Sequence, residues 1–316
     1  MLNLMQHIVS VENLTKDYET GFWKKKKVRA LDGLSLSVNE GQIFGFLGGN
    51  GAGKTTTIKL LMRLLYPTAG TASILGESID SISMHRQIGY CPENPYFYDY
   101  LTPVELFDYF GRLFDLDPAK RKAKTSELLT KVGLDERDWK KQLRKFSKGM
   151  LQRVGLAQSL INEPKIVFLD EPMSGLDPIG RREIRELIAE LPSKGTTVFM
   201  STHILSDAEA LCDEVAILSR GKLAAAGKLY ELLAESNDQP RFEIVIANAD
   251  VAKIRASIPD ATGIEQRSGD ALIIANQESD IEGILRTARD AGGSLVSINP
   301  IRRSLEDLFV AQTTTG

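Results

Sequence analysis

The sequence predicts an α/β protein built on a parallel sheet, followed by a smaller α+β domain. A glycine-rich loop at residues 48–56 stands between an apolar run and a segment whose apolar residues have helical spacing. Two further apolar runs, at 165–172 and 196–200, are nearly unbroken, which is typical of strands covered on both faces. Beyond about residue 240 the pattern becomes β-α-β-β-α-β, the order of a ferredoxin-like unit.

Composition bounds the class of protein. The chain has 316 residues, of which 42% are hydrophobic and 26% charged, with a formal net charge of -3. The length favours about two domains, and the charge argues against nucleic acid as a partner. Cys91 and Cys212 lie far apart and fit a reducing compartment. Residues 1–10 lack a signal-peptide pattern, and no apolar run is long enough to span a membrane, so we expect no membrane segment.

The first two predicted strands, at residues 8–14 and 28–38, flank a basic segment. Tyr18 lies just beyond the first strand, and the lysine run Lys24 to Lys27 lies between the two. We expect a solvated hairpin tip there. Contact with anionic lipid headgroups beside a membrane partner is the alternative hypothesis.

The glycine-rich loop fits the phosphate-binding pattern G-x-x-x-x-G-K-[ST]. Glycines let backbone N–H groups close around phosphate oxygens, and the helix that follows adds its positive dipole end. We expect Lys54 to reach the β- and γ-phosphates and the Thr55 hydroxyl to ligate Mg²⁺. The residues predicted to bind nucleotide here are Asn50, Gly51, Ala52, Gly53, Lys54, Thr55 and Thr56.

A cluster of aromatic residues follows the predicted strand 87–91. Its members are Tyr96, Phe97, Tyr98 and Tyr100. Because two prolines and several polar residues surround them, we expect a surface patch with a docking role. Local packing of these rings is the alternative.

Two capped helix starts follow. Thr102 with Glu105 forms a capping-box pattern, with proline at the first helical position. Ser147 is an N-cap candidate for a helix that runs to about residue 161. Together with the charged helical segments between them, they predict a helical subdomain over about residues 93–162.

The apolar run at 165–172 closes on two carboxylates. A phosphate loop needs an acidic partner for Mg²⁺ at the end of a neighbouring strand, and Asp170 fits. Glu171 is expected to point to the other side of the chain and to polarise an attacking water. The next apolar run leads to His203.

In this order the motifs resemble the ATP-binding cassette (ABC) ATPases over about residues 8–235. That resemblance implies a RecA-like core with an antiparallel β subdomain and a helical subdomain at residues 1–236. A small C-terminal accessory or dimerisation domain would follow at 240–316. The resemblance rests on Tyr18, the Walker A loop Gly48 to Thr56, Pro92-Glu93, the signature helix start Phe146 to Gln152, the Walker B pair Asp170-Glu171, and Ser174 to Asp177 with His203 beyond.

The resemblance also implies ligands and roles. ATP and Mg²⁺ are the expected ligands, with Tyr18 stacked on adenine, Glu171 and His203 catalytic, and Thr55, Asp170 and Glu93 on the metal. Two cassettes would close head to tail around ATP. A second copy of this chain is the expected partner, and a different cassette stays open. The residues expected to face the partner's ATP are Ser147, Lys148, Gly149 and Asp177.

Three positions depart from the family pattern. Glu93 stands where glutamine is usual, and a carboxylate about 4 Å from another would cost roughly 4 kcal/mol at an effective dielectric of 20. Glu93 is therefore expected on the metal, beside a cation, or turned away. Lys148 adds a cation to the signature and is hypothesised to contact the partner's nucleotide. Gly49 stands where proline is frequent, which should loosen the loop slightly.

The signature Ser-Lys-Gly-Met, the residue Glu93 and the ending Ser304 to Phe309 resemble the ATPase subunits of ABC-2-type exporters. In that group the permease is a separate chain, so the ATPase would be peripheral on the cytoplasmic side of the plasma membrane. A permease helix would dock near the aromatic cluster. The sequence does not identify the cargo.

Three alternative functions predict sequence features that differ from those of this chain. A soluble ABC ATPase acting on ribosomes or DNA usually carries two cassettes or a long coiled coil. A P-loop kinase of small molecules would not explain the signature helix or His203. A cassette that serves mainly as a structural clamp is disfavoured by the intact Glu171.

Overall fold

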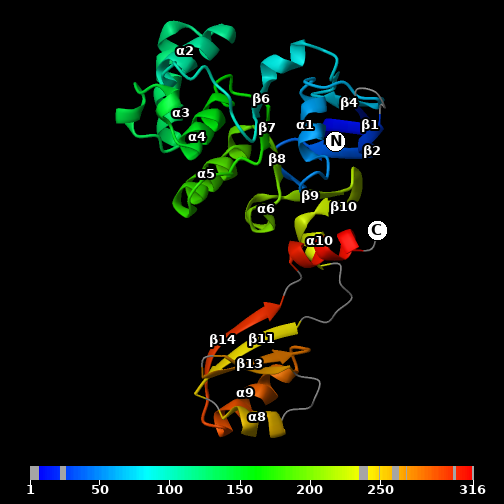
Figure 1. The fold of residues 1–316 in the computed structure, drawn as a ribbon. Helices are drawn as coiled ribbons and strands as arrows, with labels where there is room; N and C mark the ends of the chain where they lie inside the picture. The colour runs from blue at the N-terminus through cyan, green and yellow to red at the C-terminus, as the bar shows by residue number, and fades with distance from the viewer. Residues whose placement is uncertain are drawn as a thin grey trace, which may run out of the picture. The chain divides into compact units, whose positions relative to one another are not determined.

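The computed structural model of the chain (Figure 1) forms two compact units, one made of Met1–Leu229 with Phe309–Gly316 and the other of Tyr230–Leu308. The predicted domain boundary, Ser236 to Pro240, lies outside the described residues. The described residues are 7–21, 26–234, 241–248, 250–257, 263–267, 269–301 and 304–314.

The first unit is organised around a six-stranded sheet in the order β10-β9-β3-β8-β7-β6. The strands from β9 to β6 in this order run parallel, and β10 pairs antiparallel with β9. Every residue of β3, β7 and β8 is buried, as the apolar runs predict. The strands are β3 (Ile43–Leu47), β6 (Ile88–Cys91), β7 (Ile166–Asp170), β8 (Thr197–Thr202), β9 (Glu214–Ser219) and β10 (Lys222–Lys228).

A second sheet in this unit is antiparallel, with the order β2-β1-β4-β5. Strand β1 is longer than the sequence predicts. It pairs with β2 through several register shifts, and Tyr18 lies inside it opposite Val28. In the lysine run Lys26 and Lys27 are exposed, whereas Lys24 and Lys25 lie outside the described residues. The strands are β1 (His7–Thr20), β2 (Lys26–Asn39), β4 (Ala69–Ile74) and β5 (Glu77–Ser78).

Three helices of the first unit form a separate group. Figure 1 shows α2, α3 and α4, in green, gathered away from β1, β2 and β4. Both predicted caps are present, since Glu105 N–H donates to Thr102 Oγ1 (3.3 Å) and Met150 N–H donates to Ser147 Oγ (3.2 Å). The helices are α1 (Lys54–Leu61), α2 (Pro103–Leu113), α3 (Pro118–Lys131), α4 (Lys148–Gln158), α5 (Pro178–Glu190) and α6 (Leu205–Leu211), with α7 (Leu229–Ala234) at the junction of the units.

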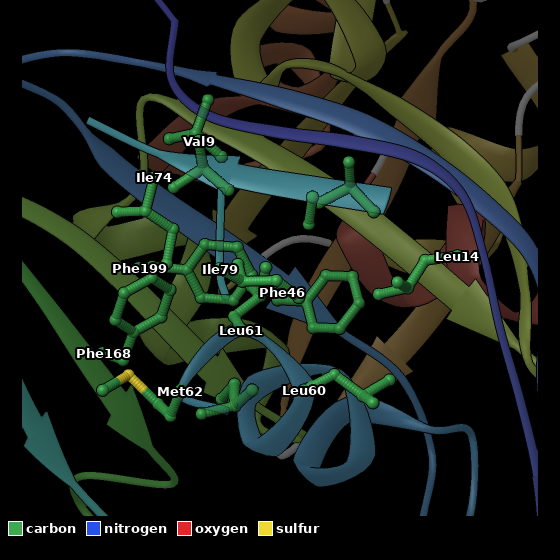
Figure 2. Close-up of a cluster of buried hydrophobic side chains, with 14 of the residues drawn as sticks. Val9, Leu14, Phe46, Leu60, Leu61, Met62, Ile74, Ile79, Phe168 and Phe199 are labelled. Carbon is green, nitrogen blue, oxygen red and sulfur yellow. The ribbon is translucent and has the colours of Figure 1, made fainter. Parts of the chain in front are cut away.

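The hydrophobic core of this unit holds both flanks of the glycine-rich loop. Figure 2 shows Phe46 of β3 beside Phe199 of β8, with Leu60 and Leu61 of α1 facing the same cluster. The ring centroids of Phe46 and Phe199 lie 5.4 Å apart, and those of Phe168 and Phe199 lie 5.3 Å apart. Each such side chain contributes about 1.5–3 kcal/mol by its burial, so the ends of the loop are fixed to the core.

The second unit has the predicted β-α-β-β-α-β order. Its antiparallel sheet has the strand order β12-β13-β11-β14, and isoleucines of β11, β13 and the two helices form a separate core. Helix α10 (Leu305–Thr314) follows along the chain, and its residues from Phe309 onward belong to the first unit. The other elements are β11 (Arg241–Ala247), α8 (Val251–Ser257), β12 (Ile264–Arg267), β13 (Asp270–Ala275), α9 (Asp280–Asp290) and β14 (Ser294–Ile301).

Two further observations concern membrane-spanning helices and the cysteines. Within the described ranges, no helix combines the length and the apolar character needed to cross a bilayer. Cys91 and Cys212 are free and buried, and burial raises the pKa of each thiol to about 12. Neither thiol is therefore reactive near neutral pH.

Candidate functional site

The loop between β3 and α1 lines a cavity of about 460 Å³. Elements that are far apart in the sequence meet around it, because β3, β7 and β8 are neighbours in the sheet and end at the same edge. The lining contains six of the seven predicted loop residues and three of the other predicted site residues. It consists of Ala30, Gly49, Asn50, Gly51, Gly53, Lys54, Thr55, Thr56, Glu93, Glu171 and His203.

Glycine is required at the start of α1. Gly53 has φ +112°, and a Cβ there would lie 2.7 Å from the Ala30 carbonyl oxygen. No side chain caps α1, so N–H groups of its first turn have no side-chain acceptor. A helix start of this kind is suited to binding an anion. Ala52 is buried beneath the loop and is absent from the lining.

Lys54 is a buried cation beneath the loop, with 7% of its surface exposed. Its ammonium group donates to the Gly48 carbonyl oxygen at 2.7 Å and lies 3.4 Å from Glu171 Oε1. The carboxylate therefore serves as the counter-ion that a buried ammonium group requires.

Glu171 also contacts His203. Its Oε2 atom lies 2.9 Å from His203 Nδ1, and the backbone N–H of His203 donates to the same oxygen at 3.4 Å. The backbone at Glu171 is left-handed, with φ +50°. Such a conformation is costly for a residue other than glycine and is found preferentially at functional sites.

Asp170 is buried, with 1% of its surface exposed, and is not among the residues that line the cavity. The Ser201 hydroxyl donates to its Oδ1 atom at 2.5 Å. Ser201 is not among the site residues predicted from the sequence. The available signal was a polar residue inside a buried strand, next to the Thr202-His203 ending.

Tyr18 and Glu93 differ in their relation to the cavity. The Tyr18 hydroxyl lies 3.4 Å from Thr56 Oγ1, and the Lys16 ammonium lies 5.4 Å from the centre of the tyrosine ring. The ring thus neighbours the loop without lining the cavity. Glu93 does line it, and among the described residues no hydrogen bond or ion pair reaches the Glu93 carboxylate.

The donor set of this site is compatible with magnesium. In the described part of the chain, no three acidic, histidine or cysteine side chains form a cluster able to hold a metal alone. Mg²⁺ is usually bound by one or two protein ligands together with substrate phosphates. The hydroxyl of Thr55 and the carboxylates of Glu93 and Asp170 are hard oxygen donors of the type it prefers.

The residues predicted to serve a partner's nucleotide form a separate cluster, and none of them lines the cavity. Ser147 caps α4, and Asp177 caps α5 by accepting from Gly180 N–H at 2.8 Å. The Lys148 ammonium lies 3.4 Å from Ser174 Oγ. A Cβ on Gly175, whose φ is +76°, would lie 3.0 Å from the Lys148 stem. A single chain therefore carries a nucleotide-sized cavity and, apart from it, this second surface.

An ion pair that was not predicted from the sequence joins α5 to α6. Arg181 of α5 donates to Asp207 of α6 at 3.0 Å, and Arg185 lies 3.6 Å from the same carboxylate. Asp207 is buried. The helix that begins at Asp177 is thus tied to the helix that follows His203.

Known proteins are similar to this chain in sequence and in fold. Residues 31–174 match the model of the ABC transporter family. The chain is 42% identical over 319 residues to an uncharacterized ABC transporter ATP-binding protein of Synechocystis, covering 98% of this chain and 85% of that protein. It is 32% identical to the bacitracin transport ATP-binding protein BcrA of Enterococcus faecalis, covering 97% of this chain and 96% of that protein.

A solved structure with the same fold is dimeric. It is an ATP-binding cassette in a post-hydrolysis state, bound to ADP and Pi. The match has a TM-score of 0.65 and 26% identity, and it covers 70% of this chain and 98% of that one.

Proposed function

The chain belongs to the family of ABC transporter ATP-binding proteins, and we propose that it drives export through a separate membrane permease by hydrolysing ATP. The observation that supports this most is the cavity shared by the glycine-rich loop, Glu171 and His203. It combines an anion-binding loop, a buried cation and a carboxylate–imidazole pair. This combination is suited to phosphoryl transfer to water.

The proposed nucleotide site uses the loop residues Asn50 to Thr56. Their backbone N–H groups and the Lys54 ammonium would hold the phosphates, and Tyr18 would lie against adenine. Lys54 would then exchange part of its contact with Glu171 for the phosphates. Thr55, Asp170 and Glu93 would hold Mg²⁺, which neutralises phosphate charge when bound.

Glu171 and His203 are the proposed catalytic pair. Glu171 would accept a proton from the attacking water, and His203 would hold the water and the γ-phosphate. Their contact at 2.9 Å means that each side chain restrains the position of the other. A positioned base of this kind typically contributes about 10²- to 10⁴-fold to the rate.

The second surface is the proposed contribution to a partner's site. Ser147, Lys148, Gly149 and Asp177 lie at the starts of two helices, where backbone N–H groups favour an anion. Two copies of the chain would close around two nucleotides. The dimeric cassette of similar fold supports this arrangement.

The aromatic cluster is the proposed docking surface for the permease. Tyr96, Tyr98 and Tyr100 are 95%, 56% and 58% exposed, and the Tyr98 ring contacts the Tyr109 ring edge-on at 6.3 Å. Exposed aromatic side chains that contact one another supply the rigid apolar area that interface cores favour. Through this contact the chain would sit at the cytoplasmic side of the membrane.

The second unit is the proposed accessory domain. Its strand order and its two helices are those expected of a ferredoxin-like fold. We assign it a role in stabilising or regulating the pair of cassettes, and no residue of it is assigned to catalysis.

Affinity purification tests the proposal. The tagged Glu171→Gln variant is purified from detergent-solubilised membranes in the presence of ATP, and its partners are identified by mass spectrometry. We expect a multispanning protein to copurify. Enrichment of ribosomal or DNA-bound components alone would contradict export and leave the ATPase assignment in place.

The docking surface is tested by the same purification, carried out on chains that keep Glu171 so that ATP hydrolysis can also be measured. Replacing Tyr96, Tyr98 and Tyr100 together by serine should release the multispanning protein and leave ATP hydrolysis by the purified chain within about twofold, because these rings lie outside the cavity. Tyr230→Ser is the matched control, since this tyrosine is 66% exposed and belongs to the second unit. Full retention of the multispanning protein by the triple variant would move the docking surface elsewhere.

A further inference from the structure

Ser201 places one hydroxyl between the carboxylate of Asp170 and the backbone N–H of Glu171. It is 0% exposed and lies in β8 directly opposite Asp170 of β7 in the parallel register. Its Oγ atom lies 2.5 Å from Asp170 Oδ1. The backbone N–H of Glu171 lies 3.2 Å from the same Oγ atom and 3.2 Å from the Ser201 carbonyl oxygen.

The direction of these hydrogen bonds follows from the atoms involved. A serine hydroxyl has one proton and two lone pairs, and an ionised carboxylate can only accept. The Ser201 proton therefore goes to Asp170, and a lone pair of Oγ accepts from Glu171. In the part of the chain that the structure describes, no other hydrogen bond or ion pair reaches the Asp170 carboxylate.

This arrangement leaves the two oxygens of Asp170 unequal. Oδ1 is fixed by the hydroxyl, and Oδ2 has no partner among the described residues. A buried carboxylate with a single neutral donor retains a charge that requires a cation. The hydroxyl thereby selects the oxygen that stays available for one.

The same hydroxyl helps to hold the strained turn at Glu171. With φ +50°, this backbone needs restraint from its surroundings. Two acceptors from Ser201 hold its N–H group, and the side chain then reaches His203 at 2.9 Å.

We propose that Ser201 is a positioning residue for both carboxylates. It orients Asp170 so that Oδ2 would be available to hold Mg²⁺, and it anchors the backbone from which Glu171 would act on the attacking water. The inference rests on the proposed ATPase site and assigns no contact between Ser201 and substrate. Removing a residue that hydrogen-bonds to a metal ligand without contacting the metal typically lowers metal affinity by 10- to 100-fold.

The test measures how strongly Mg²⁺ tightens nucleotide binding. The dissociation constant of a non-hydrolysable ATP analogue is determined with Mg²⁺ and with EDTA, and their ratio is compared between wild type and Ser201→Ala. We expect Ser201→Ala to reduce this ratio by about tenfold and to leave the affinity in EDTA within about twofold. Ser201→Thr keeps the hydroxyl and is expected to retain the ratio.

Ser159→Ala is the matched control. Ser159 is also buried at 1% exposure, and its hydroxyl donates to the Leu156 carbonyl oxygen at 2.7 Å, at the C-terminal end of α4 and outside the cavity lining. Loss of this hydroxyl should leave the Mg²⁺ ratio unchanged. If Ser201→Ala does not fold, Ser201→Cys, which donates weakly from a similar position, is expected to lower the ratio in its place.

The outcomes separate this inference from the proposed function. If Mg²⁺ does not change the nucleotide affinity of the wild-type chain, the proposed metal site itself is wrong. A normal wild-type ratio that Ser201→Ala or Ser201→Cys leaves unchanged would overturn the role of Ser201 alone. An equal loss of affinity with Mg²⁺ and with EDTA would also overturn it, because the hydroxyl would then act on the fold of the loop.

Discussion

The Nδ1 atom of His203 lies 2.9 Å from Oε2 of Glu171, while the other oxygen of the same carboxylate lies 3.4 Å from the Lys54 ammonium. One carboxylate therefore contacts both the group proposed to hold the γ-phosphate and the lysine proposed to bind it. Because of these two contacts, we expect removal of the Glu171 charge to lower turnover without weakening nucleotide binding.

Glu171→Gln should lower turnover by about 10²- to 10⁴-fold and leave nucleotide affinity equal or higher. The amide cannot accept a proton from water, and Lys54 loses its counter-ion and becomes more available to phosphate. Steady-state hydrolysis and equilibrium binding of ATP measure the two effects.

Glu186→Gln is the control for this variant, because Glu186 is an exposed helical glutamate paired with Arg182. It should change neither quantity. A Glu171→Gln variant that hydrolyses ATP at the wild-type rate would remove Glu171 from its proposed role.

Lys148→Ala should lower turnover by about tenfold without weakening the binding of ATP to the isolated chain. Lys148 belongs to the second surface and does not line the cavity, so its loss should affect hydrolysis only when two cassettes close. Hydrolysis measured over a range of protein concentrations detects this difference.

Lys145→Ala controls for the loss of an exposed cation three residues earlier. It should hydrolyse ATP as the wild type does. Unchanged affinity and turnover in Lys148→Ala would restrict that lysine to its contact with Ser174 of the same chain.

Asp207→Ala should destabilise the first unit by about 3 kcal/mol, since it leaves Arg181 and Arg185 without their shared, buried carboxylate. The free energy of unfolding from denaturant titration measures this loss. Glu186→Ala, which breaks an exposed pair with Arg182, should cost about 0.5 kcal/mol or less. Equal losses of unfolding free energy in the two variants would show that the buried ion pair of Asp207 stabilises the unit no more than an exposed pair does.

The capping box of α2 should make stability depend on pH through Glu105. Hydrogen bonds from the Thr102 backbone N–H and hydroxyl lower the pKa of Glu105 below its usual value. Its contribution is therefore fully present above the unfolded-state pKa of about 4.3 and is lost as the pH falls through the lower folded-state pKa. The difference in Tm between wild type and Glu105→Gln should be largest near neutral pH and shrink below about pH 4. A difference that stays constant from pH 7 to pH 3 would contradict this assignment.

The local motifs were predictable from the sequence because each depends on residues that are close together in the chain. The loop Gly48 to Thr56 needs glycine where φ is positive, and Thr102 with Glu105 closes a hydrogen-bonded cap within four residues. Unbroken apolar runs identified β7 and β8 because both faces of these strands are covered. The position of Tyr18 within β1 was missed because strand pairing with β2, rather than the local pattern, sets where β1 ends.

The sequence by itself determined which residues the proposed site contains, namely a loop with the phosphate-binding pattern, Asp170 and Glu171 after a buried strand, and His203 after the next. Only the tertiary structure decided how these groups contact one another. Strand β8 lies between β3 and β7, so Ser201 meets Asp170 and His203 meets Glu171 across about thirty residues of chain. Sheet order and register bring such groups together, and neither can be deduced from the spacing of residues along one strand.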